Sequence, residues 1–386
     1  YRGEAFAMGE RTPLALASAA AAARMAVGEA LTNVLSAGVV GLEAVKLSAN
    51  WMAGAGHPGR DAALYEAVHA IGMALCPSLG VSIPVGKDSL SMKVAWQESR
   101  AEKAVVSPVS PIVSAFARVA DVRLACTPQL RTDCGETVLL LIDLGAGKNR
   151  LGGSALAQVH DAFGAQVPDL DDPERFKRFF ELVSAMLREG VVLAYHDRSD
   201  GGLAATVCEM MFAGRCGVRL ELPPLAGSAR VLEMLFNEEL GAVIQVEAAR
   251  EAEIIMRFVA AGLGELVHPI GRPTADDMLI IECGGQLVYE RSLSALQRIW
   301  SETSFRMQAL RDHPDCAQEA FDRILEPDDP GLHSQLGYDP AEDIAAPYVA
   351  HGARPRIAVL REQGVNGHME MAAAFGRAAF GAVDVH

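Results

Sequence analysis

The chain has 386 residues, enough for two or more domains, because single hydrophobic cores stop growing well below this length. Half of the residues are apolar and 22% are charged, which is typical of soluble globular proteins. The formal net charge of −15 argues against a nucleic-acid surface, and no basic run suggests a membrane surface. Any phosphate group must therefore be bound locally, by backbone amides, metal ions and a few placed cations.

The cysteines and the apolar runs bear on the location of the chain. The 7 cysteines include no C-x-x-C pair, which suits a reducing cytosol and argues against a zinc cage. An alanine-rich run, Leu14 to Val27, resembles a short membrane segment, but Arg24 and then Glu29 interrupt it, so a buried helix is predicted. No signal peptide is visible, and we expect a cytoplasmic protein with no membrane or nucleic-acid partner.

The first block of the chain is expected to mix helices and strands. Its predicted elements are a helix from Thr12 to about Ser36, a strand at Val45–Ser48, a glycine-rich loop at 53–59, a helix from about Asp61 to Leu79, strands at Val81–Val85 and Ser91–Trp96 around a tight turn, and a strand at Pro111–Val119. A polar stretch at 126–135 marks a domain boundary.

The second block is expected to be built the same way. Its predicted elements are strands at Thr137–Asp143 and Val191–Ala194, helices near Gly153–Phe163 and Glu174–Arg188, a helix opening at Gly201, strands at Val218–Leu222 and Ala242–Val246, helices around Val231 and from about Ala249, and strands near Leu266, Met278 and Leu287. Strands and helices without strict βαβ alternation predict α+β layers and not a doubly wound sheet.

The last part of the chain changes character. A helix is predicted at Ser292–Arg311, and residues 313–354 carry five prolines and many acids, which indicates an extended connector. A strand at 355–360, a loop at 361–367, a helix from about His368 to Gly376 and a strand from Ala382 then predict the first βαβ unit of a parallel α/β domain. That domain stops almost immediately, so we expect the chain to be a piece of a longer protein.

The most informative segment is Leu193–Gly202, which runs from an apolar strand through a polar elbow into a helix. Free amides at a helix N-terminus attract anions, and neighbouring carboxylates can hold a hard cation. Asp197 and Ser199 alternate along the extended part and so face the same way. The segment therefore fits a nucleotide-plus-magnesium loop. Ordinary capping, with Asp200 as N-cap followed by two turn glycines, fits it equally well.

Two further segments carry candidate site residues. Glu29 and Asn33 are four apart on a predicted helix, so their oxygens can share one magnesium; the alternative is an ordinary surface pair. The rest of this helix is apolar, and a buried carboxylate needs a partner. In the predicted turn, Gly86 allows close backbone approach, Lys87 supplies a charge and Ser89 a hydroxyl, although a plain hairpin turn is the alternative. The turn is not a Walker loop, because the spaced glycines and following helix are absent.

Long strings of the chain resemble one family, the formylglycinamide ribonucleotide amidotransferases (phosphoribosylformylglycinamidine synthases) in their large single-chain form. In chain order the matching strings are GERTPLALASAAAAARMAVGEALTN, KLSANWMAGAGHPG, IPVGKDSLSMK, SAFARVADV, LAYHDRSDGGL, LFNEELGAVIQV and RPRIAVLREQGVNGHMEMAAAF. The resemblance spans nearly the whole chain.

The resemblance implies an architecture and a reaction. It implies an α+β pair of domains like those of aminoimidazole ribonucleotide synthetase, A-type at 1–130 and B-type at 136–290. A helix and extended linker at 291–353 and the truncated start of a class I glutaminase at 354–386 follow. The family uses ATP to activate the formyl amide oxygen of formylglycinamide ribonucleotide, through an iminophosphate-type intermediate. Ammonia from glutamine then displaces phosphate, in de novo purine biosynthesis.

The resemblance also implies residue roles. It makes Glu29, Asn33 and Asp197 magnesium ligands and Ser199 a contact of the nucleotide, ATP or ADP. It places Gly86, Lys87 and Ser89 in a loop lining the site for ATP and formylglycinamide ribonucleotide. In the smaller, separate-subunit members an asparagine associated with metal stands at this position. The Lys87 charge could replace that of one cation, which argues against a metal role for this residue. A further magnesium aspartate is expected before Tyr1.

The glutaminase chemistry needs a cysteine nucleophile and a His/Glu pair. The resembling domain begins only near Arg354, and no cysteine follows Cys316, so the nucleophile is not in this sequence. The resemblance places the His/Glu pair downstream of that cysteine, so none of these catalytic residues is present. We expect the chain to be inactive alone and to partner the rest of its own polypeptide, the first repeat and the full glutaminase. Two alternatives remain: a related synthetase-superfamily ATPase, which the tail from Pro355 argues against, and a structural second repeat whose nucleotide never turns over.

Overall fold

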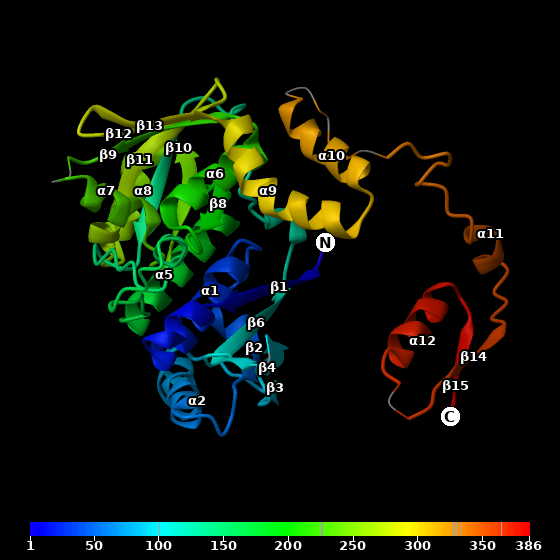
Figure 1. Cartoon of the computed structure of the whole chain (residues 1–386). Helices are drawn as coiled ribbons and strands as arrows, with labels where there is room; N and C mark the ends of the chain where they lie inside the picture. Colours follow the sequence, from blue (N-terminus) through cyan, green and yellow to red (C-terminus); the bar gives the residue numbers. More distant parts are fainter. Residues whose placement is uncertain (100, 225–226, 327–328, 330, 333, 364) are drawn as a thin grey trace. The chain divides into compact units, whose positions relative to one another are not determined.

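The chain is described from a computed structural model (Figure 1). The structure describes residues 1–99, 101–224, 227–326, 329, 331–332, 334–363 and 365–386. These form two compact units, Tyr1–Leu325 and Glu326–His386, which are described separately. The four-part division predicted from the sequence stays a prediction.

A four-stranded sheet organises the first block, in the order β1-β6-β2-β3. Its strands are β1 (Gly3–Glu10), β2 (Val45–Met52), β3 (Val85–Ser89) and β6 (Ser110–Val119). The β1–β6 and β6–β2 pairs are antiparallel, and β2–β3 is parallel. The predicted tight turn at Gly86–Ser89 is therefore wrong, because these residues form an edge strand that hydrogen bonds to β2.

Helix α1 (Ala19–Leu35) packs on β1 and β6. The predicted helix from Thr12 is in fact two, because a 3₁₀ turn at Thr12–Leu16 ends before Ser18, whose side chain accepts a hydrogen bond from the Ala21 N–H and caps α1. The alanines of α1 are buried, as predicted, and they permit very close packing. A Cβ atom at Gly9 of β1 would lie 2.1 Å from the Ala26 carbonyl oxygen.

Residues 60–79 form one continuous helical stretch, as predicted. It consists of α2 (Arg60–His69), a π-helical turn at Ala70–Leu75 and α3 (Cys76–Leu79). Its 20 residues are long and apolar enough, by length and composition alone, to cross a membrane, with 33% of the apolar window buried in the fold. Core helices of soluble proteins pass the same test, so this is weak support for a membrane segment.

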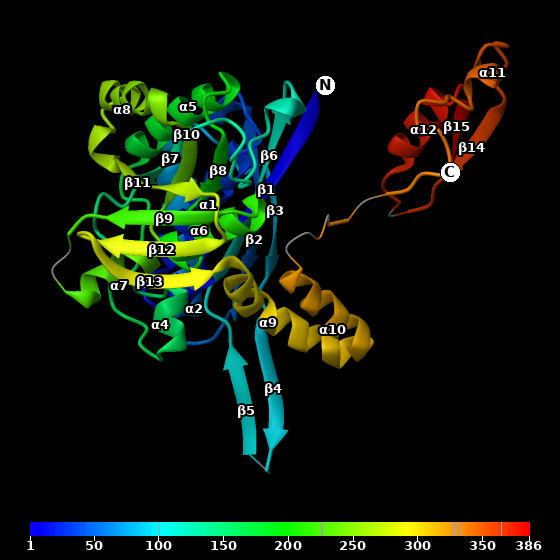
Figure 2. The same ribbon diagram turned by 90° about the horizontal axis from the view of Figure 1, so that it is seen from above.

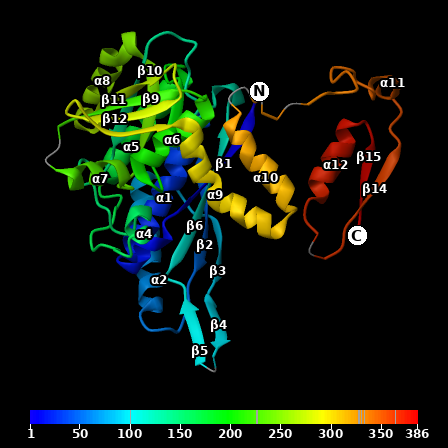
Figure 3. The ribbon, with the colours of Figure 1, turned by 45° about the horizontal axis from the view of Figure 1, so that its top comes forward.

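A two-stranded hairpin, β4 (Lys93–Glu98) and β5 (Ala101–Val106), projects beyond the first sheet (Figures 2 and 3). The predicted strand at Ser91–Trp96 lies mostly within β4. Most side chains of both strands are exposed. The hairpin therefore adds little to the core.

The second block is built on a seven-stranded sheet in the order β13-β12-β9-β11-β7-β10-β8. The strands are β7 (Thr137–Asp143), β8 (Ala194–Asp197), β9 (Gly217–Leu222), β10 (Gly241–Glu247), β11 (Val267–Thr274), β12 (Met278–Cys283) and β13 (Gln286–Ser292). The β9–β12 pair is parallel, and the other pairs are antiparallel. The predicted α+β class is confirmed.

Helices cover both faces of this sheet. They are α4 (Ala155–Val159), α5 (Pro173–Arg188), α6 (Gly202–Gly214), α7 (Ser228–Phe236), α8 (Glu251–Ala260) and α9 (Leu293–Arg311). Alternate residues of β7 enter different cores: Leu140 and Ile142 pack in a cluster shared with α1 and α5, whereas Leu139 and Leu141 pack under α6. The two sequence blocks therefore share one hydrophobic core.

A buried hydroxyl links the two blocks. The Tyr195 hydroxyl of β8 donates a 2.7 Å hydrogen bond to the carbonyl oxygen of Thr32 in α1. We expect Tyr195→Phe to lower the free energy of unfolding by about 1 kcal/mol, measured by urea denaturation, because the bond is lost in a water-poor site. Tyr65→Phe on α2, where the side chain is 69% exposed, is the control and should have no effect. Equal stability of both variants would contradict this role.

The predicted connector begins later than expected. Residues Pro314–Asp322 form helix α10 and belong to the first unit. The reason is aromatic packing: Phe321 stacks on Phe305 of α9, with ring centroids 4.3 Å apart, and the Arg298 guanidinium lies over the Phe321 ring.

The second unit contains the predicted strand–helix–strand pattern. Strands β14 (Arg356–Leu360) and β15 (Gly381–Val385) pair in parallel, with α12 (His368–Arg377) between them in the chain. A short helix, α11 (Ala346–Val349), precedes them. This is the βαβ start predicted from the sequence.

Candidate active site

A polar elbow joins β8 to α6, but the strand spans Ala194–Asp197 and not the predicted Val191–Ala194, and the cap of α6 also differs from the prediction. The N-cap of α6 is Gly201 in the left-handed region (φ 78°), and no side chain of its own caps it. Asp200 is therefore not the N-cap, and its carboxylate instead lies 3.2 Å from Arg11. The Gly201 N–H donates to Glu238 Oε1 at 2.8 Å. An internal carboxylate thus occupies part of the expected anion site.

The structure brings Glu29 and Asp197 toward each other from different blocks. Glu29 lies on α1 and Asp197 ends β8, and both are largely buried. The Glu29 carboxylate accepts a 2.7 Å hydrogen bond from the Glu10 N–H and lies 3.8 Å from the Arg11 guanidinium. Burial, with smaller contributions from the charges of Asp200 and Asp197, raises the pKa of Glu29 to about 7 against the opposing effect of Arg11.

Glu29 and Asp197 carry the kind of oxygen ligand that magnesium prefers. Among the residues that the structure describes, no group of three or more His, Cys, Asp and Glu side chains is placed to hold a metal by itself. Asn33 is exposed one turn beyond Glu29 and could add an amide oxygen. Burial is the main cause of the raised pKa of Glu29, and a bound cation would favour the charged form of this buried carboxylate. The residues therefore fit a cation shared with phosphate oxygens and water, and not an all-protein cage.

Ser199 lies in the elbow between Asp197 and the start of α6. Its side chain is half-buried, and its carbonyl oxygen accepts a 3.0 Å hydrogen bond from the Gly202 N–H. The residue is thus at the position from which a hydroxyl could contact a phosphate near Asp197.

The set Gly86, Lys87 and Ser89 lies elsewhere. On β3, Lys87 is in register with Asn50, and Ser89 with Met52, of the neighbouring β2. A Cβ atom at Gly86 would lie 2.3 Å from the Ala49 carbonyl oxygen, so glycine permits this close pairing. Strand β3 is three strand spacings, or about 14 Å, from β1. The structure does not unite this set with Glu29 beside β1.

Sequence reasoning missed a buried charged network beside the elbow. Arg11 is 3% exposed, and its Nη2 donates to the Glu238 carboxylate and carbonyl, each at 3.0 Å. The Arg198 guanidinium donates to the Glu239 carbonyl at 2.8 Å and pairs with Asp143. The available signal was the pair Glu238-Glu239 directly before an apolar strand, because buried charges are normally paired.

His196 extends this network on the side away from Arg11. Its Nε2 lies 2.9 Å from Glu209, and its Nδ1 lies 3.5 Å from Asp197 Oδ1. Burial lowers the pKa of His196, but the two carboxylates outweigh it and raise the pKa to about 9. A protonated His196 therefore partly neutralises Asp197.

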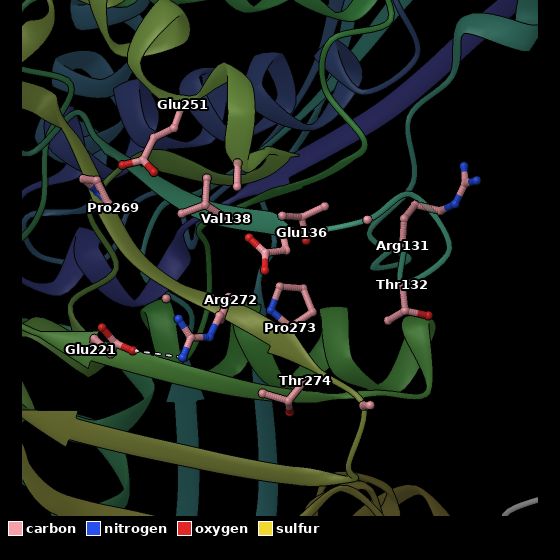
Figure 4. Close-up of a pocket in the computed structure, with 15 residues that line it drawn as sticks. Arg131, Thr132, Glu136, Val138, Glu221, Glu251, Pro269, Arg272, Pro273 and Thr274 are labelled. Atoms are coloured by element: carbon pink, nitrogen blue, oxygen red, sulfur yellow. Dashed lines mark ion pairs between the residues drawn. The ribbon is translucent and has the colours of Figure 1, made fainter.

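Two hollows lie in the same unit, away from most of the predicted residues. A polar cleft of ≈ 520 Å³ opens near the bulge at Pro269–Gly271 of β11, with Glu136, Glu221 and Arg272 among its lining residues (Figure 4). An apolar groove of ≈ 1040 Å³ lies between α6, α7, β12–β13 and α9. None of the seven predicted site residues lines either hollow.

Three domain families match the chain. Residues 1–118 match the FGAR-AT PurM_N-like domain, and residues 135–284 match the C-terminal domain of AIR synthase related proteins. Residues 354–386 match the CobB/CobQ-like glutamine amidotransferase domain.

Solved structures of other proteins share this fold. T. maritima PurL complexed with FGAR is 16% identical, with a TM-score of 0.59 over 77% of this chain and 46% of that chain. T. maritima PurL complexed with ADP is 12% identical, with a TM-score of 0.54 over 98% of this chain and 51% of that chain. E. coli HypE, a hydrogenase maturation protein, is 17% identical, with a TM-score of 0.50 over 75% of this chain and 85% of that chain. The chain spans about half the length of the PurL chains that it matches.

Proposed function

The chain belongs to the formylglycinamide ribonucleotide amidotransferase (FGAR-AT) family of ATP-dependent ligases, and we propose that it forms the second synthetase-like repeat of such an enzyme, followed by the start of its glutaminase. The intact enzyme would transfer phosphate from ATP to the formyl amide oxygen of formylglycinamide ribonucleotide. Ammonia released from glutamine would then add to that carbon and displace phosphate, forming formylglycinamidine ribonucleotide. We place this activity in the cytoplasm.

One observation supports a nucleotide site in this repeat. Arg11 lies 3.8 Å from Glu29 of the first block and 3.2 Å from Asp200 of the α6 elbow, and the charge of Asp197 helps to raise the pKa of Glu29. Glu29, Asn33 and Asp197 would hold magnesium, and Ser199 would contact a phosphate of ATP or ADP. The metal would neutralise phosphate charge. T. maritima PurL has been solved with ATP and with ADP, which supports this ligand class.

The arrangement favours a structural role for the nucleotide at this site. Glu238 already accepts the Gly201 N–H, and Arg11 already faces the carboxylates, so groups of the protein itself fill part of the site where the two blocks meet. The Gly86–Ser89 set lies at the opposite edge of the first sheet from β1, on a mostly exposed strand. We assign the first site to stability, and Gly86, Lys87 and Ser89 to the ATP and formylglycinamide ribonucleotide of the reaction.

Thermal unfolding of the 386-residue chain tests the nucleotide site. Mg²⁺ with ADP should raise the unfolding temperature, because a ligand that binds only the folded state stabilises it by mass action, about 2.7 kcal/mol at one hundred times the dissociation constant. ADP with EDTA should have a much smaller effect. Equal shifts with and without Mg²⁺ would overturn the proposed metal–nucleotide site.

The reaction loop has its own test in the intact enzyme. Lys87→Ala and Ser89→Ala should each lower the ATP-dependent amidation rate or raise KM for the ribonucleotide by about tenfold or more, with the unfolding temperature unchanged, because neither side chain is in the core. Lys46→Ala, which removes an exposed lysine from β2 of the same sheet, is the control. Wild-type kinetics in both loop variants would contradict the assignment.

A further inference from the structure

Arg11 lies at the end of β1, before the 3₁₀ turn that leads into α1. Both neighbours hold its backbone in place: the Glu10 N–H donates to the Glu29 carboxylate, and the Thr12 N–H donates to the Glu10 carboxylate. The guanidinium is 3% exposed. A cation so fixed and so buried is positioned by the fold and not by chance surface pairing.

The contacts of Arg11 join the two blocks around the proposed metal site. Its Nη1 lies 3.8 Å from Glu29 Oε1 and 3.2 Å from Asp200 Oδ1, and its Nη2 lies 3.0 Å from Glu238 Oε2. One guanidinium thus faces three carboxylates, one from α1 and two from the second block. The planar guanidinium of arginine presents N–H groups toward all three carboxylates at once, which the single ammonium group of lysine cannot do.

Glu238 fixes the other end of this arrangement. Its Oε1 accepts hydrogen bonds from the Gly201 N–H and the Ala155 N–H, both at 2.8 Å, while its Oε2 faces Arg11. Glu238 therefore ties the elbow that carries Asp197 to the strand end that carries Arg11. Burial raises the pKa of Glu238, and the charge of Arg11 opposes that effect, so each of the two buried ions depends on the other.

We propose that Arg11, clasped by Glu238, is a positioning residue of the metal site, which sets Glu29 against the Asp197 elbow so that one cation can bind both. This inference rests on the proposed metal–nucleotide site and adds to it a residue that touches neither metal nor nucleotide. Outer residues that orient metal ligands typically contribute 10- to 100-fold to metal affinity. A purely structural arginine would contribute to folding alone.

Arg11→Lys distinguishes a positioning role from a purely structural one, because lysine keeps the positive charge but lacks the planar guanidinium. The probe is Mn²⁺ in the presence of ADP, with free Mn²⁺ measured by electron paramagnetic resonance on the 386-residue chain. We expect Arg11→Lys to bind Mn²⁺ about 10- to 100-fold more weakly, with an unfolding temperature in EDTA close to that of the wild type. Glu238→Gln keeps an acceptor for the Gly201 N–H but loses the charge that faces Arg11, and it should weaken Mn²⁺ binding to a similar extent. This variant replaces Arg11→Lys in the test if Arg11→Lys does not fold.

Arg24→Met is the matched control. Arg24 of α1 forms another ion pair between the blocks, with its Nε 2.8 Å from Asp169, but contacts none of the proposed ligands. It should retain wild-type Mn²⁺ affinity. Wild-type affinity in Arg11→Lys and Glu238→Gln, with lost affinity in Asp197→Asn, would overturn the role of Arg11 alone. Wild-type affinity in Asp197→Asn would overturn the proposed metal site itself, and equal losses in Arg24→Met would reduce Arg11 to a structural contact.

Discussion

Glu29→Gln is expected to stabilise the ligand-free chain above pH 7 and to remove its stabilisation by Mg²⁺ and ADP. Burial, with smaller contributions from Asp200 and Asp197, raises the pKa of Glu29 from 4.5 to about 7. The folded chain therefore keeps a proton that the unfolded chain releases between these values. Stability should fall as pH rises through that window, by about 3 kcal/mol for a shift of this size, and stay low above it.

Urea unfolding in EDTA from pH 5 to pH 8 measures this loss. Glutamine carries no charge, so the variant should lack this contribution and exceed the wild type in stability at pH 8. Glu66→Gln, at an exposed position of α2, is the control and should follow the wild type. A wild-type stability that is flat across this range, or a variant that is less stable at pH 8, would show that the Glu29 charge is already compensated without a metal.

Asp197→Ala in the intact enzyme is expected to lose most of the nucleotide-dependent stabilisation and to keep the amidation rate nearly intact. Asp197 ends β8 of the second sheet, whereas Gly86–Ser89 belong to the edge strand β3 of the first sheet, so its loss should remove the proposed metal ligand without disturbing the proposed reaction site. The lost stabilisation should approach the full mass-action term, about 2.7 kcal/mol at one hundred times the dissociation constant.

Unfolding temperature with and without Mg²⁺ and ADP, measured alongside the amidation rate, decides between the two roles. Asp197→Asn keeps the shape of the side chain and so separates loss of charge from loss of packing. A large fall in rate with unchanged nucleotide-dependent stability would instead make Asp197 catalytic. It would also favour turnover of the nucleotide at this proposed site over a structural role.

The elements that the sequence predicts well are those whose pattern is local. Strand β7 is a continuous apolar run because both of its faces are buried, and α1 is recognisable from its small and apolar residues. Strand β1 escaped prediction because several of its apolar side chains, including Phe6 and Met8, are exposed. Strand β3 looked like a turn because its pairing partner, β2, lies some forty residues earlier in the chain.

The candidate site was predictable only in part, for a similar reason. Glu29 and Asp197 could be proposed as site residues because an acid in an apolar helix and an acid at the end of a strand before a helix are each unusual locally. The cap of α6 was assigned wrongly because the acceptor is Glu238, 37 residues further along the chain. Arg11 was missed because its partners come from three distant segments, and nothing in its immediate neighbours indicates burial.

The contact between Gly9 and α1 has a consequence for the geometry of metal binding. Here strand backbone rests directly on helix backbone, so no flexible side chain separates the Glu10 N–H from the segment that carries Glu29. Changes of side-chain rotamer in the core should therefore have little influence on the distance between the Glu29 carboxylate and the sheet. The alanines of α1 each contribute little hydrophobic stabilisation, but together they fix the position of the Glu29 carboxylate, the proposed metal ligand. A side chain at position 9 would lift the helix and so displace the Glu29 carboxylate from the Glu10 N–H.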